Sequence, residues 1–196
     1  MRPSRRFSHA IAEGDGISLL AAVDGPEAAR AAEADGAEAV VLDRVRGDLR
    51  DATELPILVL AATPAEAHEA GADAVTVAVD GLEDEDGRLE GVYSDALERG
   101  LDCVIAVRDE DELQLALDRL DPEIFLLSAR GGDEEADPLE RVLALLPDVP
   151  AGKLAIADVE IAGADAVAEL ERAGVDAVIV GAGSVAEYVG SPPPAV

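Results

Sequence analysis

Acidic side chains follow several short apolar stretches of the chain, where strands of a parallel sheet would end. They are Asp24, Asp43, Asp80, Asp158 and Glu160, with Arg44, Arg108 and Arg130 among them. Carboxylate oxygens are the usual ligands of hard divalent cations, so a metal site is one interpretation of this group. Asp is also common in tight turns and at helix starts, no histidine joins these acids, and no ligand spacing repeats. We therefore expect no metal and no cofactor, and local pairing of the arginines.

A glycine-rich turn is the second candidate for chemistry. It comprises Gly181, Ala182, Gly183 and Ser184, between an apolar stretch and a helical one. Backbone N–H groups in such a turn can bind an anion, so the expected partner is a small phosphorylated ligand or an inorganic anion. Ser128 also ends an apolar stretch, but we expect no histidine or aspartate in register with it, so no nucleophilic triad is predicted. His9 and His68 are expected on the surface.

Eight β-branched, apolar stretches recur with a period of roughly 20 residues, which indicates repeated supersecondary units. The predicted strands are 17–23, 39–42, 57–61, 74–79, 103–107, 124–127, 154–157 and 177–180. The predicted helices between them are 26–34, a short 49–54, 64–69, 89–99, 110–120, 138–146, 164–173 and 183–189. Pro26 and Pro64 open two of these helices, and glycines such as Gly71 and Gly174 follow others, which is typical of helix starts and ends.

Strict alternation of strand and helix requires a parallel sheet with right-handed crossovers, and eight such units close into a barrel. We predict a single (βα)8 TIM barrel of minimal size with short loops over residues 17–190. A stub of residues 1–16 would precede it, and a proline-rich tail of residues 191–196 would follow. An open doubly wound sheet is the alternative.

The composition narrows the classes of partner and compartment. Asp and Glu number 43 against 15 Lys and Arg, for a formal net charge of −28, which repels nucleic acid and anionic membrane surfaces. Cys103 is the only cysteine, so an internal disulfide is excluded. No long apolar run follows the first residues, so a cytoplasmic location is expected. A monomer is expected because no long exposed apolar stripe is evident.

Several short motifs occur in an order and spacing typical of one enzyme family. They are Phe7-Ser8-His9-Ala10-Ile11, Gly16-Ile17-Ser18, Gly71-Ala72-Asp73-Ala74-Val75, Gly100-Leu101-Asp102, Val107-Arg108-Asp109-Glu110-Asp111-Glu112-Leu113 and Ala173-Gly174-Val175-Asp176-Ala177-Val178-Ile179-Val180-Gly181. Together they resemble indole-3-glycerol-phosphate synthase, the barrel that closes the indole ring in tryptophan biosynthesis. The resemblance covers about residues 7–189 and implies a carbon–carbon lyase that binds a phosphorylated substrate.

The resemblance also assigns residues to the family's catalytic positions, and several of them differ in type. A glutamate and a lysine near the end of the first strand fall on Ala22 and Asp24. A lysine on the third strand falls on Leu60, and a glutamate on the fifth falls on Ala106. The resemblance therefore implies that these four functional groups are missing.

The later strands keep more polar residues. The sixth-strand asparagine falls on Ser128 and the following arginine on Arg130, so these two and Asp158 are the candidate remnants of the catalytic set. A Glu-Ser-Gly run on the seventh strand falls on Asp158, Val159 and Glu160. In the family that glycine helps to bind the phosphate, so a carboxylate at Glu160 would oppose it.

The number and position of lysines also argue against the synthase reaction. Ring closure needs a cationic general acid beside the substrate carbonyl, and the family supplies it with lysine. Lys153 is the only lysine, and it precedes the seventh strand, at the end of the barrel away from the chemistry. The basic lid after the family's first strand is also missing, because Asp24 and Gly25 run directly into the helix at Pro26.

Three hypotheses remain open from the sequence. The first, which we favour, is a non-catalytic or diverged barrel of this family with at most a remnant phosphate site. The second is the synthase itself, or a related sugar-phosphate lyase or isomerase. The third is a binding protein that works through its surface.

Overall fold

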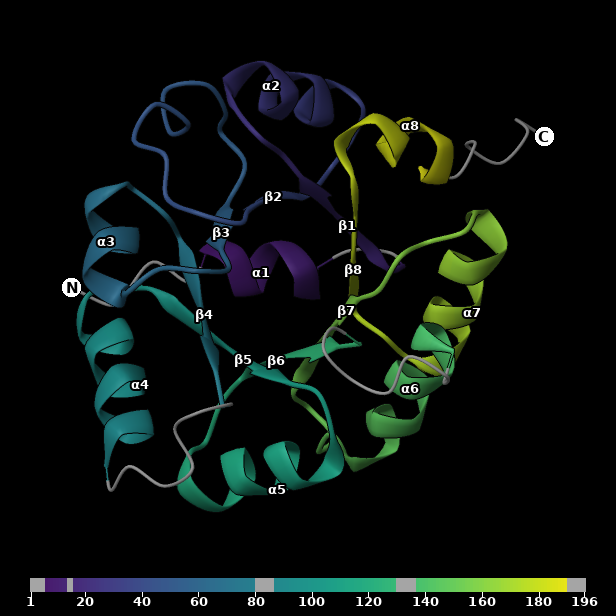
Figure 1. Ribbon diagram of the computed structural model, residues 1–196. Helices are drawn as coiled ribbons and strands as arrows, with labels where there is room; N and C mark the ends of the chain where they lie inside the picture. The colour runs from purple at the N-terminus through teal and green to yellow at the C-terminus, as the bar shows by residue number, and fades with distance from the viewer. Residues whose placement is uncertain (1–5, 14–15, 80–86, 130–136, 190–196) are drawn as a thin grey trace.

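The computed structural model describes residues 6–13, 16–79, 87–129 and 137–189. Within them, eight parallel strands form one closed sheet in chain order (Figure 1). The strands are β1 (Ser18–Ala22), β2 (Ala39–Leu42), β3 (Ile57–Val59), β4 (Ala74–Ala78), β5 (Asp102–Val107), β6 (Ile124–Ser128), β7 (Leu154–Asp158) and β8 (Ala177–Gly181). The predicted closed barrel is confirmed, and the open sheet is wrong, because β8 pairs back onto β1 up to Ala22 and Gly181.

Helices follow most strands and surround the ring (Figure 1). They are α2 (Pro26–Ala34), α3 (Pro64–Glu69), α4 (Arg88–Glu98), α5 (Glu110–Arg119), α6 (Pro138–Leu145), α7 (Ala164–Ala173) and α8 (Val185–Tyr188), with short 3₁₀ turns at Leu146–Asp148 and Ala182–Ser184. Local caps explain several starts: the Thr63 hydroxyl accepts from the Glu66 N–H while the Glu66 carboxylate accepts from the Thr63 N–H at 2.9 Å. No helix in the described part of the chain combines the length and the apolar character needed to cross a membrane.

Both faces of the strands are buried, as a parallel sheet under helices requires. Leu19 and Ala21 of β1 pack outward with the helices, whereas Leu20 packs inward with Val104, Leu126 and similar residues. Inward side chains therefore alternate with outward ones along each strand. This alternation decides which residues reach the ends of the barrel interior.

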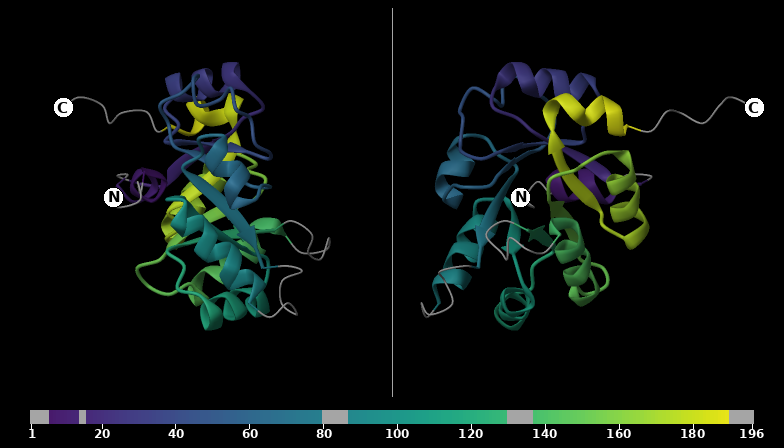
Figure 2. Two further views of the ribbon diagram at one scale, coloured as in Figure 1. Left: turned by 90° about the vertical axis from the view of Figure 1, so that its left-hand side faces the viewer. Right: turned by 45° about the vertical axis from the view of Figure 1, so that its right-hand side comes forward.

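The segment predicted as an N-terminal stub contains a helix that closes one end of the barrel. This helix, α1 (Arg6–Ala12), lies at one end of the barrel axis and contacts β2 and β7 (Figure 2). Phe7 is fully buried and Ile11 nearly so, in the same cluster as Ala39, Ala74 and Ala177. These small side chains at the starts of three strands leave space for the Phe7 ring.

The helix predicted at residues 49–54 is wrong. Residues 43–56 connect β2 to β3 through turns that are held together by the guanidinium group of Arg50. This group donates to the backbone carbonyls of Thr53 and Leu55, the latter at 2.8 Å, and pairs with Asp73 at 2.9 Å. The buried Leu49 resembles the apolar position of a helix in the sequence, but side-chain hydrogen bonds satisfy this backbone instead.

Four strands are preceded or begun by a Gly-x-acid tripeptide, and the contacts of the acid explain this pattern. In each, a glycine with positive φ ends the preceding helix region, and the acid accepts a backbone N–H from another element. The acceptor and donor residues are Glu38 with Leu19 (3.1 Å), Asp73 with Ile57 (3.0 Å), Asp102 with Ser8 (2.8 Å) and Asp176 with Ala155 (2.8 Å). Burial raises the pKa of Asp176, against the opposing effect of the Ala155 N–H.

Candidate functional site

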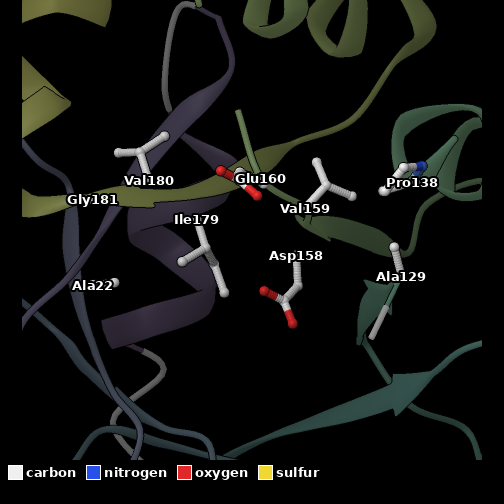
Figure 3. A pocket seen from close by; sticks show the side chains of 9 residues that line it. All are labelled: Ala22, Ala129, Pro138, Asp158, Val159, Glu160, Ile179, Val180 and Gly181. Carbon is white, nitrogen blue, oxygen red and sulfur yellow. The ribbon is translucent and has the colours of Figure 1, made fainter. Parts of the chain in front are cut away.

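Residues at the carboxyl ends of several strands line a depression, which we call the mouth. Two adjoining pockets form it, and both are lined by Ala22 and Ile179. The β7–β8 lobe has a volume of about 370 Å³ and is lined by Ala22, Ala129, Pro138, Asp158, Val159, Glu160, Ile179, Val180 and Gly181 (Figure 3). The β1–β2 lobe has a volume of about 420 Å³ and is lined by Ala22, Val23, Asp24, Ala28, Val41, Asp43, Leu60, Ile179 and Ala182.

Three of the four positions assigned by the family resemblance line this mouth. Ala22 ends β1, Asp24 lies two residues later, and Leu60 directly follows β3; all three line the β1–β2 lobe. Ala106 lies near the end of β5 and packs on the inner core cluster. The alignment by resemblance therefore placed these residues at the correct end of the barrel, although none of them has a positively charged side chain.

Ser128 and Asp158 form a hydrogen-bonded pair at the carboxyl ends of their strands, and Asp158 lines the β7–β8 lobe. They lie opposite each other on β6 and β7, and the Ser128 hydroxyl donates to Asp158 Oδ2 at 3.0 Å. Each residue is only 7% exposed. The expectation that Ser128 has no aspartate partner is wrong, because the register between the two strands, which the sequence does not reveal, brings them together.

This pair is not the start of a nucleophilic triad within the described residues. His9 lies on α1 near Glu13, with 66% of its side chain exposed, and His68 is exposed on α3. Neither histidine lines the mouth, as the sequence predicted. The Ser128 hydroxyl donates to Asp158, and neither described histidine is near enough to the mouth to complete a triad with this pair.

Three other acids of the predicted group also line the mouth. Asp24, Asp43 and Glu160 are exposed and line its lobes, whereas Asp80 lies outside the described residues. Among the residues that the structure describes, no three His, Cys, Asp or Glu side chains are placed to hold a metal ion.

Two described arginines near the strand ends are engaged by local partners. Arg108 forms an ion pair with Glu112 of α5, which confirms local pairing for this residue, whereas Arg130 lies outside the described residues. Arg141, on α6, donates to the carbonyl of Ala129 at 2.9 Å beside the β7–β8 lobe. Sequence analysis missed Arg141, since nothing in its local pattern indicates that α6 turns it toward this strand end.

The predicted anion-binding turn follows β8 directly. Gly181 lines the β7–β8 lobe and Ala182 the β1–β2 lobe, while Gly183 is exposed and Ser184 half-buried. A 3₁₀ turn of three residues and the four-residue α8 replace the longer helix predicted at 183–189. Glu160 lines the same lobe as Gly181.

The fold and the position of the cavity define the class of this protein: a parallel (βα)8 barrel with its pocket at the carboxyl ends of the strands. The structure is similar to thiamine phosphate pyrophosphorylase from Pyrococcus furiosus, with a TM-score of 0.65 and 18% identity over 88% of this chain and 90% of that chain. At this identity, the likeness concerns the fold alone.

A profile of the indole-3-glycerol phosphate synthase family matches residues 62–187, and the chain belongs to this family. Indole-3-glycerol phosphate synthase of Geobacillus sp. (strain WCH70) is 29% identical over 139 residues, which are 68% of this chain and 53% of the relative. That of Bacillus mycoides (strain KBAB4) is 39% identical over 64 residues, 33% of this chain and 24% of the relative. The chain thus spans about half the length of the Geobacillus relative, and its match to the Bacillus mycoides relative covers 24% of that protein.

Proposed function

We propose that this protein is a diverged barrel of the indole-3-glycerol phosphate synthase family that does not perform the synthase reaction and binds a small ligand at its mouth. One observation carries the proposal. Ala22, Asp24, Leu60 and Ala106 lie at or near the strand ends where the resemblance assigns two glutamates and two lysines. Three of them cannot transfer a proton or bear a charge, and the fourth has the opposite charge to lysine.

The position of the only lysine supports this proposal. Lys153 lies just before β7 and pairs with Asp121, which precedes β6, so both belong to the amino-terminal end of the barrel. A general acid must lie within hydrogen-bond reach of the group that it protonates. Lys153 is therefore on the wrong side of the barrel core to serve a substrate in the mouth.

The position of the segment that matches the family profile also supports loss of the synthase reaction. The matched segment starts at residue 62, after β3, so Ala22, Asp24 and Leu60 all precede it. The part of the chain that most resembles the family therefore excludes the strands to which two lysines and one glutamate are assigned. Divergence concentrated in β1–β3 is consistent with loss of the original reaction.

A weak phosphate site is the second part of the proposal. The turn of Gly181, Ala182, Gly183 and Ser184 offers backbone N–H groups near the β7–β8 lobe. Glu160 lines the same lobe, and its carboxylate would repel a phosphate dianion. We propose that the site retains low affinity for a phosphorylated ligand or inorganic anion, because the glycine-rich turn is present but the nearby charge is unfavourable.

The location and assembly of the protein are also proposed. A formal net charge of −28 disfavours nucleic acid and anionic membranes as partners. We propose a cytoplasmic monomer that needs neither metal nor cofactor. Light scattering at several concentrations tests the assembly state.

Turnover assays test the main claim. Purified protein incubated with carboxyphenylamino-deoxyribulose phosphate is expected to form no indole-glycerol phosphate above background, since proton transfer and electrostatic stabilisation each contribute orders of magnitude to rate. Turnover above background that Asp158→Ala abolishes would contradict the proposal. The same preparation can be titrated with inorganic phosphate at constant ionic strength. Glu160→Gly should then strengthen binding about tenfold, whereas Asp148→Asn, which removes a charge at the opposite end, should not.

A further inference from the structure

Thr76, on β4, has a buried hydroxyl group without a hydrogen-bond partner. The residue is 8% exposed, and its Oγ1 atom is buried and has no partner among the described residues. A polar group that is buried without a partner costs free energy, so most buried polar groups are hydrogen-bonded. Valine has nearly the same shape and would avoid this cost. The hydroxyl is therefore a candidate contact for a molecule other than the chain itself.

The sheet geometry directs Thr76 toward the inside of the barrel. Ala74 packs in the inner core cluster and Val75 in the outer one, so alternation along β4 turns Thr76 inward. Leu58 on β3 pairs with Ala74 on β4. Two residues further along both strands, Leu60 therefore lies beside Thr76. Because Leu60 lines the β1–β2 lobe, Thr76 belongs to the inner wall next to this lobe.

Small side chains lie between Thr76 and the mouth. Ala78 is the next inward residue of β4 and pairs with Ala106 of β5. Ala78 is exposed, as is Ala22 of β1, and Ala106 is half-buried. The opposite end of the barrel is closed by α1, whose Phe7 is fully buried. The mouth is thus the side from which a molecule can approach the hydroxyl.

The surroundings of Thr76 favour an uncharged ligand. Leu60 and Ile179 give the adjoining lobe aliphatic walls. A charged group placed between such walls would lose its hydration without gaining a counter-charge. Asp24 and Asp43, which are exposed at the same lobe, would also repel an anion. An uncharged oxygen atom has neither difficulty and can accept a hydrogen bond from the hydroxyl.

We propose that the β1–β2 lobe binds a small uncharged molecule whose hydroxyl or carbonyl oxygen accepts a hydrogen bond from Thr76 and whose aliphatic body packs on Leu60 and Ile179. This inference rests on the proposed binding of a small ligand at the mouth and names a ligand class for one of its lobes. Binding satisfies the buried hydroxyl, which gives a physical reason for a threonine in an otherwise apolar layer.

The test compares cyclopentanol with cyclopentane, which share a ring and differ in one hydroxyl group, in wild type and in Thr76→Val. Amide shifts of the full chain are followed by NMR at one pH and ionic strength. Thr76→Val should weaken cyclopentanol binding about tenfold and leave cyclopentane binding within about twofold, because only the alcohol loses a hydrogen bond. The largest shifts should be at Leu60, Ala78 and Ala106. No saturable binding of cyclopentanol, or an equal effect of the substitution on both probes, would overturn the inference.

Ser18 provides a matched control. Its hydroxyl is also buried without a partner, and it pairs with the inward Ala177, but it begins β1 at the end that α1 closes. Ser18→Ala should leave cyclopentanol binding unchanged, and Thr76→Ser, which keeps the hydroxyl, should retain most of it. Thr76→Val should not lower the melting midpoint, because it removes an unpaired polar group, so unfolding would not explain its loss of binding. Equal losses of binding in Ser18→Ala and Thr76→Val would contradict the proposed contact.

Failure of this inference can be told apart from failure of the proposed function. If inorganic phosphate binds at the turn after β8 and cyclopentanol does not bind, the alcohol site is wrong and the phosphate site stands. Synthase turnover would contradict the proposed loss of activity whatever the result with cyclopentanol.

Discussion

The two ends of this barrel use carboxylates in opposite ways. At the amino-terminal end, Asp73, Asp102 and Asp176 accept backbone N–H groups of neighbouring elements and hold the strands and α1 together. At the mouth, Asp24 and Asp43 are exposed and line a cavity. The same residue type therefore holds the structure together at one end and is exposed to solvent at the other.

This difference explains why family membership is easier to recognise than function. Motifs such as Gly71-Ala72-Asp73 and Gly174-Val175-Asp176 precede strands and fix the amino-terminal end. The residues that would decide chemistry, including Ala22 and Leu60, lie at the mouth. Sequence similarity can thus persist through residues that stabilise the barrel while the reactive end changes.

The largest expected effect is a loss of stability when the packing of α1, the helix that closes the amino-terminal end, is removed. Phe7→Ala should lower the free energy of unfolding by about 3–5 kcal/mol, because a fully buried ring leaves a cavity among small side chains. Urea denaturation measures it. Leu97→Ala, at a side chain that is 44% exposed, is the control and should cost less than about 1 kcal/mol. Similar losses for both variants would show that α1 contributes little to the core.

A matched pair of acids tests the contrast directly. Asp73→Ala should cost about 2–4 kcal/mol, since it leaves the Ile57 N–H and the Arg50 guanidinium without this acceptor. Asp43→Ala, at the mouth, should change stability by less than about 0.5 kcal/mol. Chemical denaturation at one pH and ionic strength compares them. Equal costs would remove the distinction between the two ends.

The smallest expected effect concerns the pH dependence of one acid. Because burial raises the pKa of Asp176 in the folded state above its ordinary value of 3.8, folding takes up protons as this group titrates. The stability of wild type relative to Asp176→Asn should therefore increase as the pH falls from 7 through the folded pKa, and level off below 3.8. Partial exposure limits the change to less than about 1 kcal/mol. A difference that moves the other way would mean that the Ala155 hydrogen bond outweighs burial.

Much of the fold could be predicted because its signals are local. Apolar β-branched stretches, prolines at helix starts and glycines after helices predicted all eight strands near their observed positions and most of the helices. The helix expected at 49–54 failed because Arg50 stabilises that loop through Asp73, 23 residues away. The role of Phe7 also depends on distant residues, since its space is formed by alanines on three strands.

The sequence by itself determined the residue types at the strand ends, the single lysine and the strongly negative charge. Only the tertiary structure decided that Ser128 donates to Asp158 and that Arg141 reaches the Ala129 carbonyl. The physical reason is that strand register and helix rotation depend on how the whole sheet closes and packs. Local patterns specify which side chains reach the mouth, whereas the geometry between neighbouring strands specifies which of them meet.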